Sequence, residues 1–478
     1  MADVSTPTAS TTEEGGLRRS ITGKQLFFYT LGDVLGSGIY VLIGLVAAAV
    51  GGAFWIAFAV GVTIAAITGT AYAELVTKYP KAAGAALYVN KAFGNKALTF
   101  MITVSFLSAS FAAAGSLAGG FASYFATLWE GPSPLLVTLL FVLALSVVNF
   151  IGITESVVIN MLMAFVEIAG LLLILFIAIW YIAEGDADFG TLTEFDTGDT
   201  NWSLAILAGV ALSFFAMTGF ENTANVAEET IDPHRSFPRS LIGGMVTAGV
   251  VYVLVSMAAA LTVPTDELAK SPAALLEVVE KGILPFVDTG FMSTLFSVIA
   301  MIAITNTTLV AIVTQPRILY GMANEDVVPG VFGKIHASRR SPWVGLIFSA
   351  LVVCALLVVG DVAPKVEGTP LVERLALVTV VFLLFIYALV IVSCLKLRGR
   401  DEDERAFRAN TPLLLLGLVG NIAILGWTVY DDPTSLLWCA GLVAVGVVLF
   451  LLEYLFGNRS DPPDAGRGDA AVAAGRES

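Results

Sequence analysis

Long apolar runs alternate with short polar segments along almost the whole chain. A helix needs roughly 20 apolar residues to cross a bilayer, and most of the runs have about that length. The pattern predicts about twelve membrane-spanning helices, near residues 25–50, 53–77, 97–128, 134–151, 155–183, 202–227, 238–263, 286–322, 342–360, 371–396, 411–430 and 435–456. Two further segments between the spans read as short helices, one amphipathic at 81–95 and one in the loop 265–283.

The composition supports a membrane protein. Hydrophobic residues make up 57% of the 478 residues and charged residues only 13%, whereas soluble domains average about 25% charged residues. Residues 1–24 are polar and lack the apolar core of a signal peptide, which favours a cytoplasmic tail. Residues 457–478 are polar and predict a disordered cytoplasmic tail. The fold class is therefore an all-α polytopic membrane protein.

The distribution of Lys and Arg predicts the topology. If the N-terminus is cytoplasmic, all but four of the 25 Lys and Arg residues fall on the cytoplasmic side. Positive loops face the cytoplasm, so we expect an even number of spans, both termini inside and a multi-pass protein of the plasma membrane. The formal charge of −14 then lies in tails and loops, including the acidic external loop 184–200.

The first span is interrupted near its middle. Gly36, Ser37 and Gly38 follow Asp33 within an otherwise apolar run, and each glycine costs a helix roughly 1 kcal/mol relative to alanine. An unwound turn in a membrane exposes N–H groups from one half-helix and C=O groups from the other. These groups suit a ligand with both a carboxylate and an ammonium group. Close packing of helices is the alternative role of such glycines.

The sixth span carries a second interruption, at Met217-Thr218-Gly219, followed by the carboxylate of Glu221. Paired interruptions in the two halves of a transporter point to its binding site. The spacing predicts a first repeat at 25–184 (spans one to five) and a second at 201–397 (spans six to ten), with 411–456 outside the repeat. Five spans per repeat place the two copies in opposite orientation.

Several blocks of sequence share the order found in a known family. They are GDVLGSGIY at 32–40, AELVTKYP at 73–80, GFE at 219–221, AEE at 227–229 and RILYGMA at 317–323. In this order they resemble the amino acid–polyamine–organocation (APC) superfamily, and within it the amino-acid permeases. The resemblance covers roughly residues 25–410.

The resemblance implies a five-plus-five inverted repeat like that of the bacterial leucine transporter, with a substrate site between broken helices 1 and 6. The substrate carboxylate would meet N–H groups near Ser37 and Gly38. The ammonium group would meet carbonyls of Val34, Phe215 and Thr218, and the Phe215 ring would close over the substrate. The substrate-binding residues carried over are Val34, Gly36, Ser37, Gly38, Phe215, Ala216 and Thr218.

Carboxylates inside the membrane are the candidates for gating or ion coupling. Charges there are costly, so such groups usually line cavities, pair with a cation or become neutral. Asp33 and Glu221 lie beside the two interruptions. Many members of the family resemble the stretch around residues 151–168 but carry Lys at the position of Glu167. Glu167 could hold a proton, bind Na⁺ with Thr307 or Thr308, or face elsewhere.

These features predict a secondary active transporter that moves amino acids by alternating access. The sequence is compatible with transport coupled to protons, transport coupled to sodium, and exchange. No Lys or Arg stands in mid-span, which suits cationic or neutral amino acids. A non-transporting sensor, or a subunit of a membrane complex, is the alternative. A membrane enzyme is disfavoured, because no Walker loop, GxSxG or HExxH motif is present.

The expected partners are a small amino-acid substrate and the lipid bilayer, and the chain could be a monomer or a homo-oligomer. We expect no nucleic acid, no metal and no cofactor apart from H⁺ or Na⁺ as a coupling ion.

Overall fold

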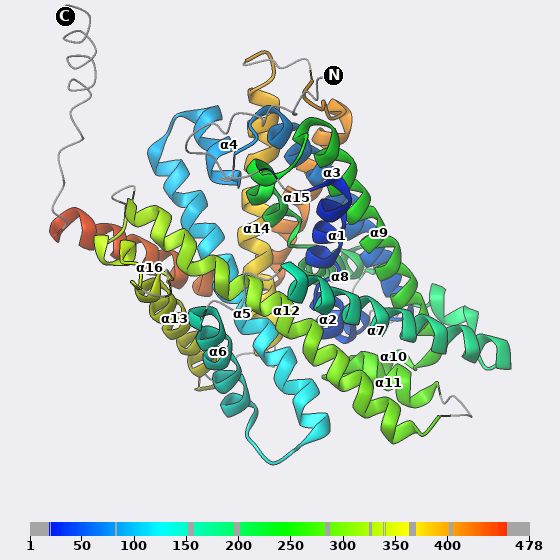
Figure 1. Ribbon diagram of the computed structural model, residues 1–478. Coiled ribbons are helices and arrows are strands. Elements are labelled where there is room, and N and C mark those ends of the chain that lie inside the picture. Colours follow the sequence, from blue (N-terminus) through cyan, green and yellow to red (C-terminus); the bar gives the residue numbers. More distant parts are fainter. Residues whose placement is uncertain are drawn as a thin grey trace, which may run out of the picture.

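The computed structural model describes residues 19, 21–81, 84–151, 157–195, 201–282, 287–324, 327–337, 339, 341–362, 370–400 and 405–456 (Figure 1). Its longer helices are α1 (Gly23–Val34), α2 (Gly38–Val50), α3 (Trp55–Lys78), α5 (Lys96–Leu128), α6 (Pro134–Ile151), α7 (Val157–Glu184), α8 (Trp202–Ala216), α9 (Pro233–Thr262), α12 (Thr289–Asn324), α13 (Trp343–Val362), α14 (Leu371–Lys396), α15 (Thr411–Asp431) and α16 (Thr434–Phe456). The all-α class is confirmed for these residues. Both predicted tails fall almost wholly outside them.

Within the described residues, the number of helices able to span a membrane is at most one lower than the sequence predicts, if α1 and α2 count as one span. In this part of the chain, ten helices are long and apolar enough to cross a membrane, and the number is eleven if α1 and α2, bent by 43° at their break, are counted as one span. The remaining predicted span, the sixth at 202–227, corresponds to α8, which has 15 residues. Twelve spans and the inverted repeat therefore stay predictions.

The sixth span differs from its predicted extent of 202–227. The α-helix stops at Ala216, and after a turn the chain continues as the 3₁₀ helix η4 (Phe220–Glu229). Gly219 in this turn has φ +113°, and a Cβ there would lie 2.7 Å from the carbonyl oxygen of Asp33. Only glycine fits such a backbone without strain, so the break is fixed by the sequence.

Helices α1, α2, α8 and α14 form the centre of the bundle. Helix α2 packs against α8, α1 against α9, and α14 against α5, α8 and α15. Helices α6, α13, α15 and α16 lie further out, and their outer faces expose large apolar side chains such as Leu140, Leu351, Val419 and Leu437. Apolar outward faces suit contact with lipid, whereas the interrupted helices are shielded from it.

The short helices lie at opposite ends of the bundle. Helix α4 (Gly84–Phe93) is near the top of Figure 1, and α10 (Thr265–Lys270) and α11 (Ala274–Lys281) are near the bottom. Both α10 and α11 pack against α2. The helical predictions for 81–95 and 265–283 are confirmed in their described parts.

Candidate functional site

The first interruption is held open by side chains from other helices. Helix α1 ends at Val34, and α2 begins at Gly38. The hydroxyl of Tyr252, on α9, donates to the carbonyl oxygens of Val34 (2.7 Å) and Gly36 (3.1 Å). The N–H of Ser37 donates to Oγ1 of Thr307, on α12, over 3.1 Å. These bonds replace some of the backbone pairing that unwinding removes.

The two interruptions touch each other through glycines. A Cβ on Gly38 would lie 2.5 Å from Cα of Ala216, the last residue of α8. A Cβ on Gly36 would lie 2.9 Å from Oγ1 of Thr307. Gly38 is therefore needed for the close approach of the two backbones, and Gly36 leaves room for the side chain of Thr307. The start of α2 and the end of α8 share one contact region.

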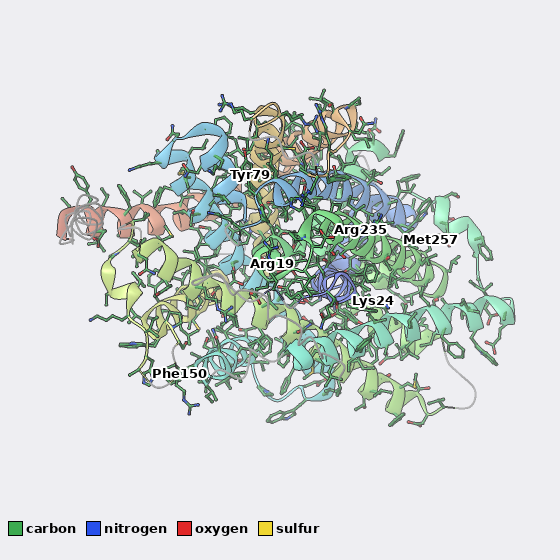
Figure 2. The ribbon with its side chains drawn as sticks, turned by 45° about the horizontal axis from the view of Figure 1, so that its top comes forward. Arg19, Lys24, Tyr79, Phe150, Arg235 and Met257 are labelled. Atoms are coloured by element: carbon green, nitrogen blue, oxygen red, sulfur yellow. The ribbon has the colours of Figure 1, made fainter. Side chains whose placement is uncertain are left out.

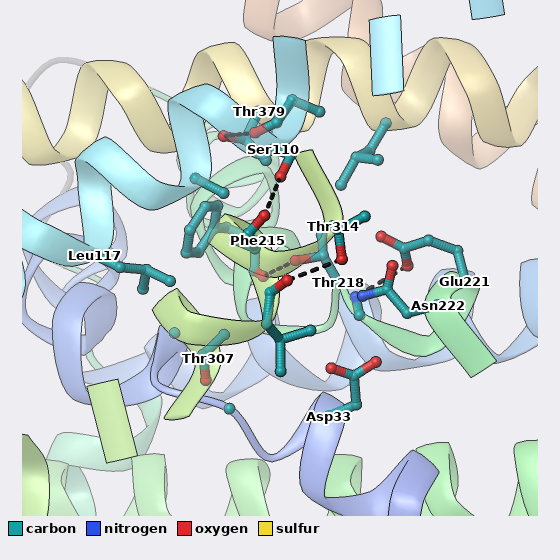
Figure 3. A pocket seen from close by; sticks show the side chains of 18 of the residues that line it. Asp33, Ser110, Leu117, Phe215, Thr218, Glu221, Asn222, Thr307, Thr314 and Thr379 are labelled. Carbon is teal, nitrogen blue, oxygen red and sulfur yellow. Dashed lines mark hydrogen bonds between the residues drawn. The ribbon is translucent and has the colours of Figure 1, made fainter. Parts of the chain in front are cut away.

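A cavity of about 80 Å³ lies between the two interruptions (Figure 3). Helices α1, α2, α5, α8, α12 and α14 and the turn after α8 all contribute to its wall. The predicted site residues that line it are Asp33, Gly36, Ser37, Gly38, Phe215, Ala216, Thr218, Glu221 and Thr307. The structure thus brings together both interruptions and most of the predicted residues.

Three predicted residues do not line this cavity. Val34 is fully buried, and its carbonyl already accepts the bond from Tyr252. Thr308 is also buried and donates to the carbonyl of Ile304 over 2.7 Å. Glu167 lies on α7, with 0% of its surface exposed. A direct role at the cavity is therefore less favoured for these residues than for Thr307.

The carboxylates near the cavity have different surroundings. Glu221 Oε2 accepts from the hydroxyl of Tyr387 (2.7 Å) and from the N–H of Gly219 (2.9 Å). Asp33 Oδ2 and Ser37 Oγ are buried and have no hydrogen-bond partner within the described part of the chain. The structure therefore leaves one carboxylate oxygen and one hydroxyl available beside the first interruption.

Glu167 is the most isolated carboxylate. Neither of its carboxylate oxygens has a hydrogen-bond partner among the described residues, although its backbone carbonyl accepts from the hydroxyl of Tyr40 over 2.9 Å. Asp33 lies within electrostatic reach of it. In the described segments no group of three or more His, Cys, Asp or Glu side chains could hold a metal ion.

The backbone ends at the cavity offer both donors and acceptors. Ser37 makes no side-chain cap on α2, so the N–H groups of the first turn, starting at Gly38, lack the usual partner. The carbonyl of Phe215 accepts from the N–H and the hydroxyl of Thr218, over 3.2 and 2.8 Å. A carbonyl oxygen has two lone pairs. The Phe215 carbonyl, one of those predicted to bind an ammonium group, therefore already accepts two hydrogen bonds.

Sequence reasoning missed the residues that reach the site from other helices. Tyr252 and Tyr387 are polar aromatics in the middle of apolar spans, and this was the signal available for them. Ser110, Thr314 and Thr379 also line the cavity. Hydroxyl residues are too common in membrane helices for their spacing alone to mark a site.

A second polar cluster ties α3 to the segment between α14 and α15. Arg398 donates from Nε and Nη2 to the two carboxylate oxygens of Glu74, over 2.9 and 2.7 Å. The N–H of Ala409 also donates to Glu74 (2.8 Å), and Arg398 Nη1 donates to Thr411 Oγ1 (2.6 Å). Lys78 donates to the carbonyl of Leu397 over 2.6 Å. These contacts form a clamp around Glu74 that joins α3 to this segment.

The helical bundle, its two interruptions and the cavity between them define a multi-pass membrane protein of the transporter class. The chain belongs to the amino acid permease family, whose model matches residues 21–458.

Individual relatives are distant but match along most of their length. The branched-chain amino acid permease BcaP of Bacillus subtilis is 24% identical, over 93% of this chain and 95% of that protein. The methylthioribose transporter of the same organism is 25% identical, over 91% and 93%. Human cationic amino acid transporter 4 is 26% identical, over 76% and 58%. The protein is thus a transporter and not an enzyme.

Proposed function

We propose that this protein is a secondary active transporter that moves amino acids across the plasma membrane by alternating access. The observation that carries the proposal is the cavity between the two interruptions, whose lining includes both the uncapped start of α2 and the end of α8. A helix start attracts a carboxylate and a helix end attracts a cation. An α-amino acid in the cavity would find both.

The proposed membrane arrangement has twelve spans, with α8 as the core of the sixth, and both termini in the cytoplasm. The two interruptions support an inverted repeat of 25–184 and 201–397, because each occurs in the first span of its repeat. Substrate at such a repeat interface would be exposed to one side of the membrane at a time.

The cavity favours substrates without a negative side chain. Among the described residues, its lining includes the carboxylates of Asp33 and Glu221 and no Lys, Arg or His. An acidic side chain would therefore meet like charge with no cation to offset it. At about 80 Å³, the cavity is below the roughly 300–1,000 Å³ of drug-sized sites. We infer that the substrate is a small neutral or cationic amino acid. Because one relative is named a methylthioribose transporter, methylthioribose is included in the test panel.

Glu167 is proposed as a coupling residue. An unpaired carboxylate shielded from water is costly unless a proton or a cation accompanies it. A proton is the simpler companion, because it needs no further ligands, and neither carboxylate oxygen has a hydrogen-bond partner among the described residues. Sodium bound jointly with Thr307 is the alternative.

Counterflow in proteoliposomes tests the transport proposal. Proteoliposomes are preloaded in turn with each unlabelled member of a panel, and only those that contain a substrate should take up the labelled amino acid. A panel of leucine, serine, lysine, glutamate and methylthioribose would identify the substrate class. Gly38→Ala places a methyl group against the backbone of Ala216 and should reduce counterflow at least tenfold. Gly426→Ala is the matched control, because a Cβ there meets nothing within 4 Å.

The result separates the proposed function from its alternatives. Binding of amino acids without counterflow would indicate a sensor or a subunit of a larger complex. Counterflow of methylthioribose alone would overturn the amino-acid proposal. Equal loss in both glycine variants would mean that the Gly38 contact has no special role.

A further inference from the structure

A second cavity, of about 740 Å³, lies at the end of the bundle where α9 begins. Arg235 and Arg239 line it from the first turns of α9, and Arg405 and Phe407 line it from the segment before α15. Asp232 is the acidic residue in the lining. Among the described lining residues, Arg235 and Arg239 contribute two guanidinium groups against the carboxylate of Asp232, so the wall formed by the start of α9 has a net positive charge.

The two arginines of α9 share one helix face. Arg235 and Arg239 are exposed and stand four residues apart, so they are neighbours on the helix surface. Figure 2 shows Arg235 at the end of the bundle that also carries Arg19 and Lys24. Lys24 lies in the first turn of α1, next to Gly23, whose carbonyl accepts a hydrogen bond from the hydroxyl of Ser240 on α9 over 2.8 Å. The basic charge of the cavity is therefore continuous with that of the neighbouring surface.

An apolar stripe continues from the cavity along the same helix. Ile242 lines the cavity, and Val246, Val250 and Leu254 follow at four-residue intervals. Their side chains are 46%, 54% and 46% exposed. Because i and i+4 positions lie above one another, the stripe runs from the basic cavity down the membrane-spanning part of α9. A ligand that fits this surface has an anionic head and an apolar tail.

We propose that this surface binds an anionic phospholipid, with its phosphodiester in the cavity and an acyl chain along the apolar stripe. Arginine suits phosphate because its planar group donates two parallel hydrogen bonds. Basic pockets at the cytoplasmic ends of membrane helices have the position and charge that lipid head groups need. A soluble phosphate ester would use the arginines but gain nothing from Val246 and Val250.

The contribution of the arginines sets the expected size of the effect. Each basic residue near a membrane surface typically strengthens the binding of anionic lipid by roughly fivefold. Arg235→Gln/Arg239→Gln should therefore weaken the binding of phosphatidylglycerol by about 25-fold. Arg239→Gln alone should weaken it by about fivefold, which gives a second measurement from a less altered protein.

Titration of the delipidated full-length protein in detergent, followed by native mass spectrometry, measures the binding. Phosphatidylglycerol should bind at least tenfold more tightly than phosphatidylcholine. Lys81→Gln/Lys96→Gln is the matched control, because it removes two positive charges from exposed residues outside the cavity. It should leave the affinity unchanged. Val246→Ser/Val250→Ser should weaken the binding of the lipid but not that of glycerol 3-phosphate.

Three outcomes would overturn the proposal. Equal affinities for phosphatidylglycerol and phosphatidylcholine would show that the charge of the head group does not contribute to binding. Equal losses in the arginine and lysine variants would show that net charge acts without the cavity. Displacement of the lipid by an equal concentration of glycerol 3-phosphate would assign the cavity to a soluble phosphate ester. None of these measurements depends on transport, so they stand apart from the proposed function.

Discussion

Breaking the pair of Glu74 and Arg398 should reveal how strongly the clamp holds α3 to the segment after α14. The side chains are 9% and 14% exposed, and they form two parallel hydrogen bonds. Hydrogen bonding to Glu74 raises the pKa of the Arg398 guanidinium, which therefore stays charged. Replacement of either partner by Gln leaves the other charge largely buried.

The expected cost follows from this burial. Removal of one partner from a buried ion pair costs about 3–5 kcal/mol, and the slight exposure here favours the lower end, about 3 kcal/mol for Glu74→Gln or Arg398→Gln. The double variant leaves no unpaired charge, so its cost should not exceed the larger single cost. The coupling energy, which is the sum of the two single costs minus the cost of the double variant, should therefore be at least about 3 kcal/mol.

Denaturant unfolding in detergent micelles, followed by circular dichroism, measures the four free energies of the cycle. Asp266 and Lys270 supply the control pair, because they stand one turn apart on α10 and are 65% and 79% exposed. Their coupling should be below about 0.5 kcal/mol. If the costs at Glu74 and Arg398 add to within about 0.5 kcal/mol, the clamp does not act as a unit and this reasoning fails.

Three further changes test the two interruptions and the buried carboxylate. Gly219→Ala should lower counterflow at least tenfold, since the residue has φ +113° and its added methyl group meets the backbone of Asp33; unchanged counterflow would contradict this. Tyr252→Phe removes two hydrogen bonds to the first interruption and should destabilise the protein by about 1–3 kcal/mol, measured by denaturant unfolding; a cost near zero would show that the bonds are dispensable. Glu167→Gln should abolish the pH or sodium dependence of uptake, whereas Glu184→Gln, at the exposed end of the same helix, should not; equal dependence in both would exclude Glu167 from coupling.

The sequence was most informative where local physics decides the structure. The apolar runs located the spans to within a few residues, because burial in lipid requires continuous apolar helix. The interruption at Gly36 and Gly38 was visible because glycine weakens a helix. The end of α8 at Ala216 was less clear, since the 3₁₀ helix that follows keeps a helix-like pattern of apolar residues.

The rest of the site depends on contacts between residues far apart in sequence. Nothing near Val34 indicates that its carbonyl would bond to Tyr252, 218 positions away. Glu167 could be noticed from the sequence as a charge within a span. Whether its carboxylate finds a partner depends on the packing of several helices and could not be read from the residues around it.

The geometry of the first interruption bears on how substrate could be recognised. The carbonyl groups of the unwound turn accept hydrogen bonds from the hydroxyl of Tyr252, and the N–H of Ser37 donates to the hydroxyl of Thr307. The turn can therefore stay unwound without a ligand, because other helices satisfy part of its backbone. The start of α2 has no side-chain cap from Ser37. A carboxylate arriving there would gain the uncapped N–H groups without the cost of unwinding a helix, which is the advantage of a preorganised site. Because Gly38 packs on Ala216, any shift of α2 toward the carboxylate would also press on the end of α8, and so the two interruptions should respond to substrate together.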